Sequence, residues 1–349
     1  MLAPVNIHRY TMSRILLICA GFVASVTHAE AQSSPTSTAV VTALPRATRA
    51  VAYFDRSLER VVMIGGPEQP RANLRDKVWS WSGKRWEVET VAGPLSRGNA
   101  GAAYDVKRKV GIVTGGSRRT ANDSSFESIA ETWEGGRTLW QPIEQTDIPP
   151  RDHHSLVFDE RRGTVLMFGG MSSGGTSPWP TDTWERQVTG WTRIATTGPA
   201  GRARTAMAFD RRREHVVLFG GVGAAPGVGA PQPFFGDTWV FERGAWREVS
   251  GSGPRARYAH AMVFDERAGV VLLYGGAAAH RNAPLADMWQ WDGARWTEIA
   301  MTGPTPGFRY QPIMVYDRKR SITVLYGGLQ GNDDDTWEWN GRSWTRFAP

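Results

Sequence analysis

The chain repeats one arrangement of apolar and polar positions at intervals of 50 to 55 residues. Each copy opens with a short apolar segment ending in an aromatic residue and Asp, passes a charged turn, and continues into a mainly apolar run ending in Gly-Gly. The Asp residues are Asp55, Asp105, Asp159, Asp210, Asp265 and Asp317, and the glycine pairs end at Gly66, Gly116, Gly170, Gly221, Gly276 and Gly328. A period of this length is typical of repeat architectures in which each copy is one supersecondary unit.

Each copy then carries two tryptophans seven residues apart, namely Trp79/Trp86, Trp133/Trp140, Trp184/Trp191, Trp239/Trp246, Trp289/Trp296 and Trp337/Trp344. The apolar runs are short and rich in β-branched and aromatic residues, which favours buried strands over helices. Asp292-Gly293 and Asn340-Gly341 lie midway between their tryptophans and are typical of two-residue hairpin turns. That turn predicts that Trp289 lies directly opposite Trp296, and Trp337 opposite Trp344.

These patterns predict four strands in each of six copies. One such sheet cannot cover both of its faces, whereas six sheets arranged radially cover one another. We therefore expect an all-β fold, a six-bladed β-propeller with four antiparallel strands per blade, in which the tryptophans pack blade against blade. The expected blades span about 46–94, 95–150, 151–199, 200–254, 255–304 and 305–349.

The first 31 residues are typical of a secretory signal peptide. Arg14 precedes the apolar stretch Ile15–Val26, and Ala29-Glu30-Ala31 is a small-x-small cleavage signal. Cleavage there predicts a periplasmic or secreted protein, followed by a linker over 32–45 whose segment Val40–Leu44 could pair with the last blade. Removal of the leader takes away Cys19, the single cysteine, and therefore excludes disulfides and Cys-based zinc sites in the mature chain.

The glycine doublet, the Asp-Thr-Trp opening of the third strand and the second Trp resemble the Kelch repeat family and the related propeller of galactose oxidase. The resemblance covers about residues 47–347. Proteins of this kind serve as binding modules, actin cross-linkers, ubiquitin-ligase adaptors, sugar mutarotases and copper oxidases. Copper-radical oxidation is excluded because its tyrosine–cysteine cross-link needs a cysteine, and we expect neither a metal nor another cofactor.

Five arginines occupy the position eight residues before the Asp of their copies: Arg97, Arg151, Arg202, Arg257 and Arg309. If the first strand is innermost, these side chains form a ring near one mouth of a central channel. Guanidinium groups bind carboxylate and phosphate bidentately, so the ring is a candidate anion site, to which His154 and His260 would add donors. The alternative is that each Arg ties its own blade to the next, and that both histidines are structural.

The turns after the first strands are basic, with fourteen Lys and Arg against ten Asp and Glu. Since the leader carries two Arg and one Glu, the formal net charge of +7 becomes +6 after cleavage, and these turns supply +4 of it. Weak association with anionic surfaces is one interpretation, and ordinary solvated turns are the other. Export disfavours nucleic acid, no further stretch has the length of a membrane span, and we expect a monomer.

These observations predict a non-catalytic binding module for a protein or carbohydrate partner, which would bind at the variable loops around the arginine ring. The alternative is a carbohydrate-active enzyme, similar to a mutarotase, epimerase or lyase, that uses the arginine ring. The sequence assigns no catalytic residue.

Overall fold

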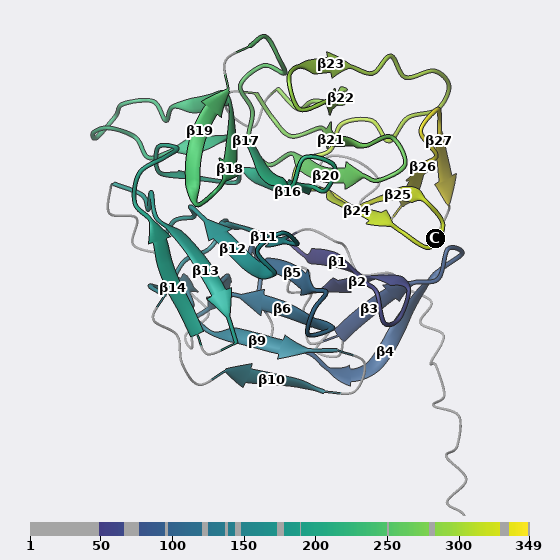
Figure 1. The fold of residues 1–349 in the computed structure, drawn as a ribbon, viewed down its shortest axis with the longest axis horizontal. Coiled ribbons are helices and arrows are strands. Elements are labelled where there is room, and N and C mark those ends of the chain that lie inside the picture. The colour runs from purple at the N-terminus through teal and green to yellow at the C-terminus, as the bar shows by residue number, and fades with distance from the viewer. Residues whose placement is uncertain are drawn as a thin grey trace, which may run out of the picture. The chain divides into compact units, whose positions relative to one another are not determined.

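Short β-strands in groups of four make up the part of the chain that the structure describes (Figure 1). The computed structural model describes residues 49–65, 77–94, 97–120, 125–136, 139–143, 148–172, 178–188, 190–249, 251–278, 283–328 and 335–347. All of them belong to one unit, Thr38–Pro349. The predicted leader, the linker and the strand at Val40–Leu44 lie outside the described residues.

Six antiparallel sheets, one for each repeat, hold these strands. From the innermost strand outward, the first three sheets are β1 (Val51–Asp55), β2 (Arg60–Ile64), β3 (Lys77–Trp81) and β4 (Trp86–Ala92); β5 (Gly101–Asp105), β6 (Val110–Thr114), β9 (Thr132–Gly135) and β10 (Trp140–Ile143); and β11 (Ser155–Asp159), β12 (Thr164–Phe168), β13 (Thr183–Gln187) and β14 (Gly190–Ala195). The last three are β16 (Ala206–Asp210), β17 (His215–Gly223), β18 (Phe234–Glu242) and β19 (Ala245–Val249); β20 (Ala261–Asp265), β21 (Val270–Tyr274), β22 (Met288–Trp291) and β23 (Trp296–Glu298); and β24 (Ile313–Asp317), β25 (Ile322–Tyr326), β26 (Thr336–Trp339) and β27 (Trp344–Phe347). In addition, β15 (Arg202–Ala203) pairs with β17, while β7 (Ser117–Arg119) and β8 (Phe126–Ser128) form a separate hairpin.

This arrangement confirms the predicted all-β, six-bladed propeller with four antiparallel strands per blade. The second strand of each blade is almost entirely buried, as its continuous apolar run predicts. The described residues contain no helix that is long and apolar enough to cross a membrane.

The six innermost strands form a closed ring. Contacts run from β1 through β5, β11, β16 and β20 to β24, and β24 in turn contacts β1. Among the described residues, the first and last blades share no strand, so side chains must join them. Trp86 of the first blade donates its Nε1 hydrogen to Thr336 Oγ1 of the last blade at 3.0 Å, and its ring lies 4.9 Å from that of Tyr326. Packing and hydrogen bonding therefore close the ring.

The second Trp of a repeat binds the preceding blade in the same way elsewhere. Trp191, Trp246 and Trp296 donate to Thr132, Thr183 and Thr238, respectively, at 2.8 to 3.1 Å. At the corresponding threonine positions the first repeat has Val78 and the fifth has Met288. Trp140, which packs near Val78, has no hydrogen-bond partner within the part of the chain that the structure describes, and Trp344 Nε1 lies 3.3 Å from Met301 Sδ. The predicted packing of tryptophans between blades is confirmed.

The register of the two outer strands corrects the turn prediction. Trp291, and not Trp289, pairs with Trp296 across the ladder, and Trp289 lies opposite Glu298. The turn has four residues because Asp292 Oδ1 accepts hydrogen bonds from two backbone N–H groups within it, those of Ala294 and Arg295. The last blade shows the same register, with Trp339 opposite Trp344 and Trp337 opposite Arg346. The two predicted direct pairings are therefore wrong.

The Asp that ends each innermost strand shapes the turn that follows it. Asp55 Oδ1 accepts hydrogen bonds from the backbone N–H groups of Ser57 and Leu58 at 2.8 and 3.0 Å. The same pair of bonds occurs at Asp105, Asp159, Asp210 and Asp265. We call the end of the ring that carries these turns the turn face. The opposite end, where the innermost strands begin, is the loop face.

Candidate functional site

The five arginines predicted as a ligand ring are buried, each against groups of its own blade. Their exposed fractions are 0–4% at Arg97, Arg151, Arg202, Arg257 and Arg309. Each Nη1 group donates to the carbonyl of the first glycine in the doublet of its blade, at 3.0 to 3.2 Å. Each guanidinium also pairs, at 2.5 to 2.9 Å, with the acid two residues before the first Trp, which is Glu131, Asp182, Asp237, Asp287 or Asp335.

The main chain of the same arginines joins neighbouring blades. The carbonyl oxygens of Arg151, Arg202, Arg257 and Arg309 accept hydrogen bonds from the second glycine of the preceding doublet at 2.8 to 2.9 Å. One residue therefore holds its own blade through its side chain and the preceding blade through its backbone. These contacts give the arginines a structural role, and their binding of an anion stays a prediction.

Asp182, Asp237 and Asp287, three of the carboxylates that pair with these arginines, are held in the ionised form. Burial alone would raise the pKa of Asp182, but hydrogen bonds from Arg151 and Trp184 outweigh it and leave that pKa lowered. Asp237 and Asp287 have lowered pKa values for the same reasons. Such carboxylates are anionic partners of the guanidinium groups and do not serve as proton donors near neutral pH.

The two predicted histidines, His154 and His260, are buried between blades. Burial, followed by the charges of Arg151 and Arg257, lowers the pKa of each to about 3. Neither ring has a hydrogen-bond partner of standard geometry within the described residues, and His260 packs edge-on against Phe219 at 5.6 Å. Both rings are therefore neutral at physiological pH, and their part in ligand binding stays a prediction.

A second ring of residues lies at the loop face, two positions before each innermost strand. This mouth ring consists of Arg49, Asn99, His153, Arg204, Ala259 and Gln311. All six have left-handed backbone conformations, with φ between +54° and +66°, although none is glycine. Backbone hydrogen bonds of 2.8 to 3.1 Å link them in order from Arg49 to Gln311, each N–H donating to the carbonyl of the preceding member.

The left-handed conformation costs on the order of 1 kcal/mol for each non-glycine residue, so the surrounding structure must hold it in place. Strain of this kind gathers at functional sites in proteins. The mouth ring also holds its backbone rigidly while its side chains differ from blade to blade. It is therefore the strongest candidate for a functional site on the loop face.

Two members of the mouth ring, His153 and Arg204, make polar contacts with neighbouring side chains. His153 Nδ1 lies 2.5 Å from Asp152 Oδ1, and Ser128 Oγ donates to Asp152 Oδ2 at 2.7 Å. Burial lowers the pKa of His153, although Asp152 acts against this effect. On the other side, Arg204 Nη1 donates to the Tyr310 hydroxyl at 2.7 Å.

The sequence alone contains enough information to locate some residues of this site. Among the five repeats that carry the arginine, the residue two positions after it is different each time, whereas the arginine itself recurs. The arginine–carboxylate pairing also has a signal, because the first repeat has Ala47 in place of the arginine and Lys77 in place of the acid. The left-handed conformation has no such signal, since Asn, His, Arg, Ala and Gln do not require it.

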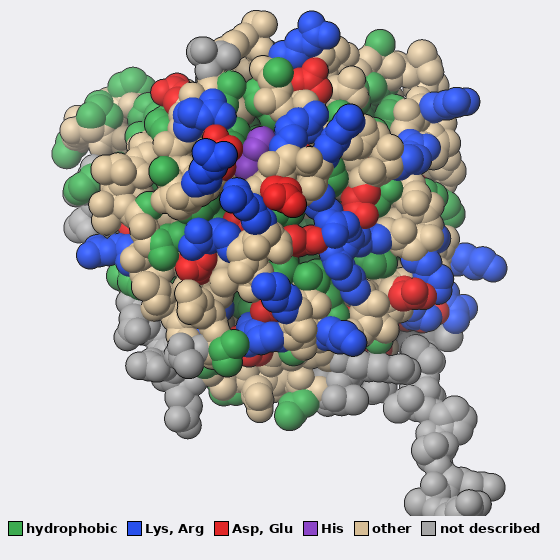
Figure 2. All heavy atoms as spheres, in the orientation of Figure 1, with side chains coloured by type: hydrophobic (Ala, Val, Ile, Leu, Met, Phe, Trp, Pro, Cys, Tyr) green, Lys and Arg blue, Asp and Glu red, His purple; other side chains and the backbone are tan. Residues whose placement is uncertain are grey.

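The basic turns predicted from the sequence are partly neutralised by neighbouring acids. Figure 2 shows Lys and Arg interspersed with Asp and Glu over one face of the molecule. Arg60, for example, pairs with Glu87, and Arg162 with Glu185. The turn residues without a salt bridge to another described residue are Lys107, Lys109, Arg161, Arg212 and Arg267. Association with anionic surfaces stays a prediction that depends mainly on these five.

The six sheets define the chain as a six-bladed β-propeller, and the mouth ring lies at one end of its axis. A solved structure titled "Structure of YjhT" is similar to it, with 12% sequence identity, a TM-score of 0.64, and coverage of 86% of this chain and 97% of that chain. At this identity the likeness shows the fold alone. No family model matches the chain, and no curated protein matches it.

Proposed function

We propose that the protein is an exported, Kelch-type propeller that acts as a binding module and takes its partner at the mouth ring. The recurring glycine doublets and Asp-Thr-Trp segments support the Kelch assignment. The single observation that carries the binding role is the ring of six left-handed, non-glycine residues linked by backbone hydrogen bonds. Rigid backbone with varied side chains is what a recognition surface on a repeat scaffold requires.

The chemistry of the mouth ring favours an acidic glycan as the partner. Arg49 is exposed and Arg204 is half-buried, so both guanidinium groups are placed to meet carboxylates. Asn99 and Gln311 add amide donors and acceptors for hydroxyl groups. Gln311 Nε2 lies 3.5 Å from Asn99 Oδ1, so the two amide groups are close to each other. A protein partner with an acidic surface is the alternative that remains if neither sugar in the test below binds.

The test is calorimetric titration with tetragalacturonate and with its carboxyl-reduced, neutral counterpart. We expect the acidic form alone to bind, and Arg49→Gln and Arg204→Gln to weaken binding about tenfold each through loss of a charge-assisted hydrogen bond. The matched control is Arg243→Gln, because Arg243 is also exposed and left-handed, with φ +52°, but lies in the β18–β19 turn. Equal binding of the two sugars, or unchanged binding by both mouth variants, would refute the acidic-glycan proposal.

A second candidate function is proton transfer on the same class of ligand, and the Asp152–His153 pair favours it. A carboxylate that accepts from one ring nitrogen orients the histidine and stabilises its protonated form, which makes the other nitrogen a general base. Removal of the proton next to a uronate carboxyl group is the first step of both epimerisation and elimination.

Deuterium exchange into tetragalacturonate in D2O, followed by NMR, tests this second candidate. We expect exchange with the wild-type protein and none with His153→Gln at sugar concentrations that saturate both proteins. Absence of exchange in the wild type leaves the non-catalytic binding module as the function.

A further inference from the structure

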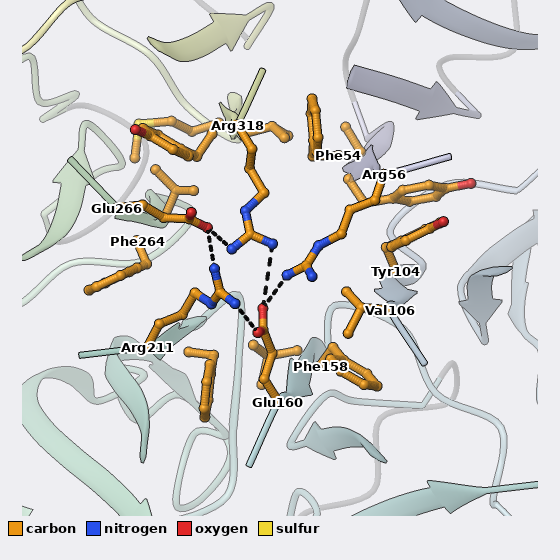
Figure 3. A pocket seen from close by; sticks show the side chains of 18 residues that line it. Phe54, Arg56, Tyr104, Val106, Phe158, Glu160, Arg211, Phe264, Glu266 and Arg318 are labelled. Carbon is orange, nitrogen blue, oxygen red and sulfur yellow. Dashed lines mark hydrogen bonds and ion pairs between the residues drawn. The ribbon is translucent and has the colours of Figure 1, made fainter. Parts of the chain in front are cut away.

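A separate cluster of charged side chains lies in the channel at the turn face (Figure 3). Its members, here called the turn-face cluster, each directly follow the Asp of their blade: Arg56, Glu160, Arg211, Glu266 and Arg318. They line a pocket of about 210 Å³. The five-residue innermost strands, about 17 Å long, separate this pocket from the mouth ring.

The members of the turn-face cluster are joined by ion pairs across the channel. Glu160 pairs with Arg56 at 2.6 Å and with Arg211 at 2.5 Å. Glu266 pairs with Arg211 at 3.1 Å and also with Arg318. Arg318 in addition lies 3.8 Å from Glu160. Side chains from five blades thus meet at one point, as the dashed lines in Figure 3 show.

The order of charges around the ring is incomplete. From the third blade to the sixth the charges alternate, as Glu160, Arg211, Glu266 and Arg318. The first blade then carries Arg56 and the second carries the uncharged Val106, so adjacent blades contribute two arginines in succession, and Glu160 contacts both from across the channel. Three guanidinium groups face two carboxylates, so every arginine has an anionic partner but the cluster carries a net charge of +1 when both carboxylates are ionised.

The walls beside these two arginines are apolar. Phe54 lies between Arg318 and Arg56 in Figure 3, and Val106 lies on the other side of Arg56. An inorganic anion would use only the guanidinium groups, whereas an organic anion would also bury carbon atoms against these walls.

We propose that the turn-face cluster is a binding site for a small organic carboxylate, whose carboxylate group lies between Arg56 and Arg318 and whose carbon atoms lie against Phe54. The bound carboxylate balances the net positive charge of the cluster. A guanidinium fork matches the planar geometry of a carboxylate, and the low exposure of Arg318, 18% for its side chain, limits screening by water.

Affinity at this site depends on pH. Burial raises the pKa of Glu266 to about 7, against the effect of Arg211, and burial also raises the pKa of Glu160. The charged and titratable groups that face Glu266 are Arg211, Arg318, Glu160, Asp265 and Tyr316. Lowering the pH from about 8 to about 6 protonates Glu266 and raises the net charge of the cluster, so a carboxylate binds more tightly.

The probe is butyrate, titrated into the full mature chain at pH 8 and pH 6 by isothermal calorimetry, with butyramide and inorganic phosphate as separate arms. We expect butyrate to bind more tightly than phosphate and more tightly at pH 6, and butyramide not to bind. Binding of butyramide like butyrate, or of phosphate alone, overturns the proposal.

Three variants locate the site. Arg56→Gln is expected to weaken butyrate binding about tenfold. Val106→Glu supplies an internal carboxylate without removing an arginine and is expected to abolish binding. Glu266→Gln is expected to bind with the affinity of the wild type at pH 6, with no change between pH 6 and pH 8.

The matched control is Arg60→Gln, because Arg60 lies in the same turn as Arg56 but pairs with Glu87 outside the pocket. Far-UV circular dichroism shows that each variant is folded. Wild-type affinity in both Arg56→Gln and Val106→Glu overturns the proposal, as does absence of butyrate binding to the wild type at pH 6.

Discussion

Replacement of Trp86 by Phe tests how the first and last blades are held together. Trp86 and Trp140 occupy the same position in their repeats and are equally buried, with exposed fractions of 5% and 4%. They differ in hydrogen bonding and in the rings they contact. Trp86 donates to Thr336 Oγ1 at 3.0 Å and packs on Tyr326, whereas Trp140 Nε1 has no hydrogen-bond partner within the described residues. Trp140→Phe is therefore a matched control for the loss of ring volume.

The expected difference follows from the cost of unsatisfied polar groups. Trp86→Phe removes a hydrogen bond with a net contribution of about 1 kcal/mol and leaves the Thr336 hydroxyl without its donor. Trp140→Phe removes a buried N–H group that has no partner among the described residues, and removal of this unsatisfied group offsets part of the stability that is lost with the packing. We therefore expect Trp86→Phe to lower the free energy of unfolding by about 2 kcal/mol more than Trp140→Phe does.

The assay is urea unfolding followed by far-UV circular dichroism, because most tryptophan fluorescence comes from residues in other interfaces. The double variant Trp86→Phe with Thr336→Val completes a double-mutant cycle and should recover about 1 kcal/mol, since both polar partners are then absent. Equal losses in the two single variants, with no coupling in the cycle, would show that hydrogen bonding does not close the ring.

Further expectations concern the buried side chains. Because the pKa of His154 is lowered to about 3, the unfolded chain takes up a proton between pH 6.5 and pH 3 that the folded chain does not, so stability falls as the pH drops through this window. His154→Leu should reduce that slope by about 1.4 kcal/mol per pH unit in urea titrations at several pH values, and an unchanged slope would contradict a neutral buried ring. Arg257→Gln leaves the half-buried Asp287 without its guanidinium partner and should cost about 3–5 kcal/mol, whereas the exposed Arg243→Gln should cost less than about 0.5 kcal/mol; similar values for both would rule out the structural role of Arg257. Trp296→Ala should cost about 3–5 kcal/mol, and a loss below about 1 kcal/mol would mean that this ring does not pack between blades.

The fold could be predicted from the sequence because its information is local and repeated. The apolar runs fix which strands are buried, and the Asp after each innermost strand caps the next turn through its own backbone neighbours. The predicted direct pairing of Trp289 with Trp296 was wrong, although it also concerned a local turn. The Asp292 side chain caps a four-residue turn and shifts the register, an outcome that the dipeptide Asp-Gly does not distinguish from a two-residue turn.

The candidate sites could be predicted only in part. The sequence located five arginines at one recurring position, but the tertiary structure decided that their guanidinium groups turn into their own blades toward carboxylates such as Asp182. Only the closed ring brings Arg56, Glu160 and Arg318 together, because these residues are far apart in the chain and come from three different blades. The left-handed residues of the mouth ring likewise depend on hydrogen bonds between neighbouring blades. The sequence by itself therefore determined the blades, whose contacts are local, whereas the axial sites depend on groups that meet only when the blades close around the channel.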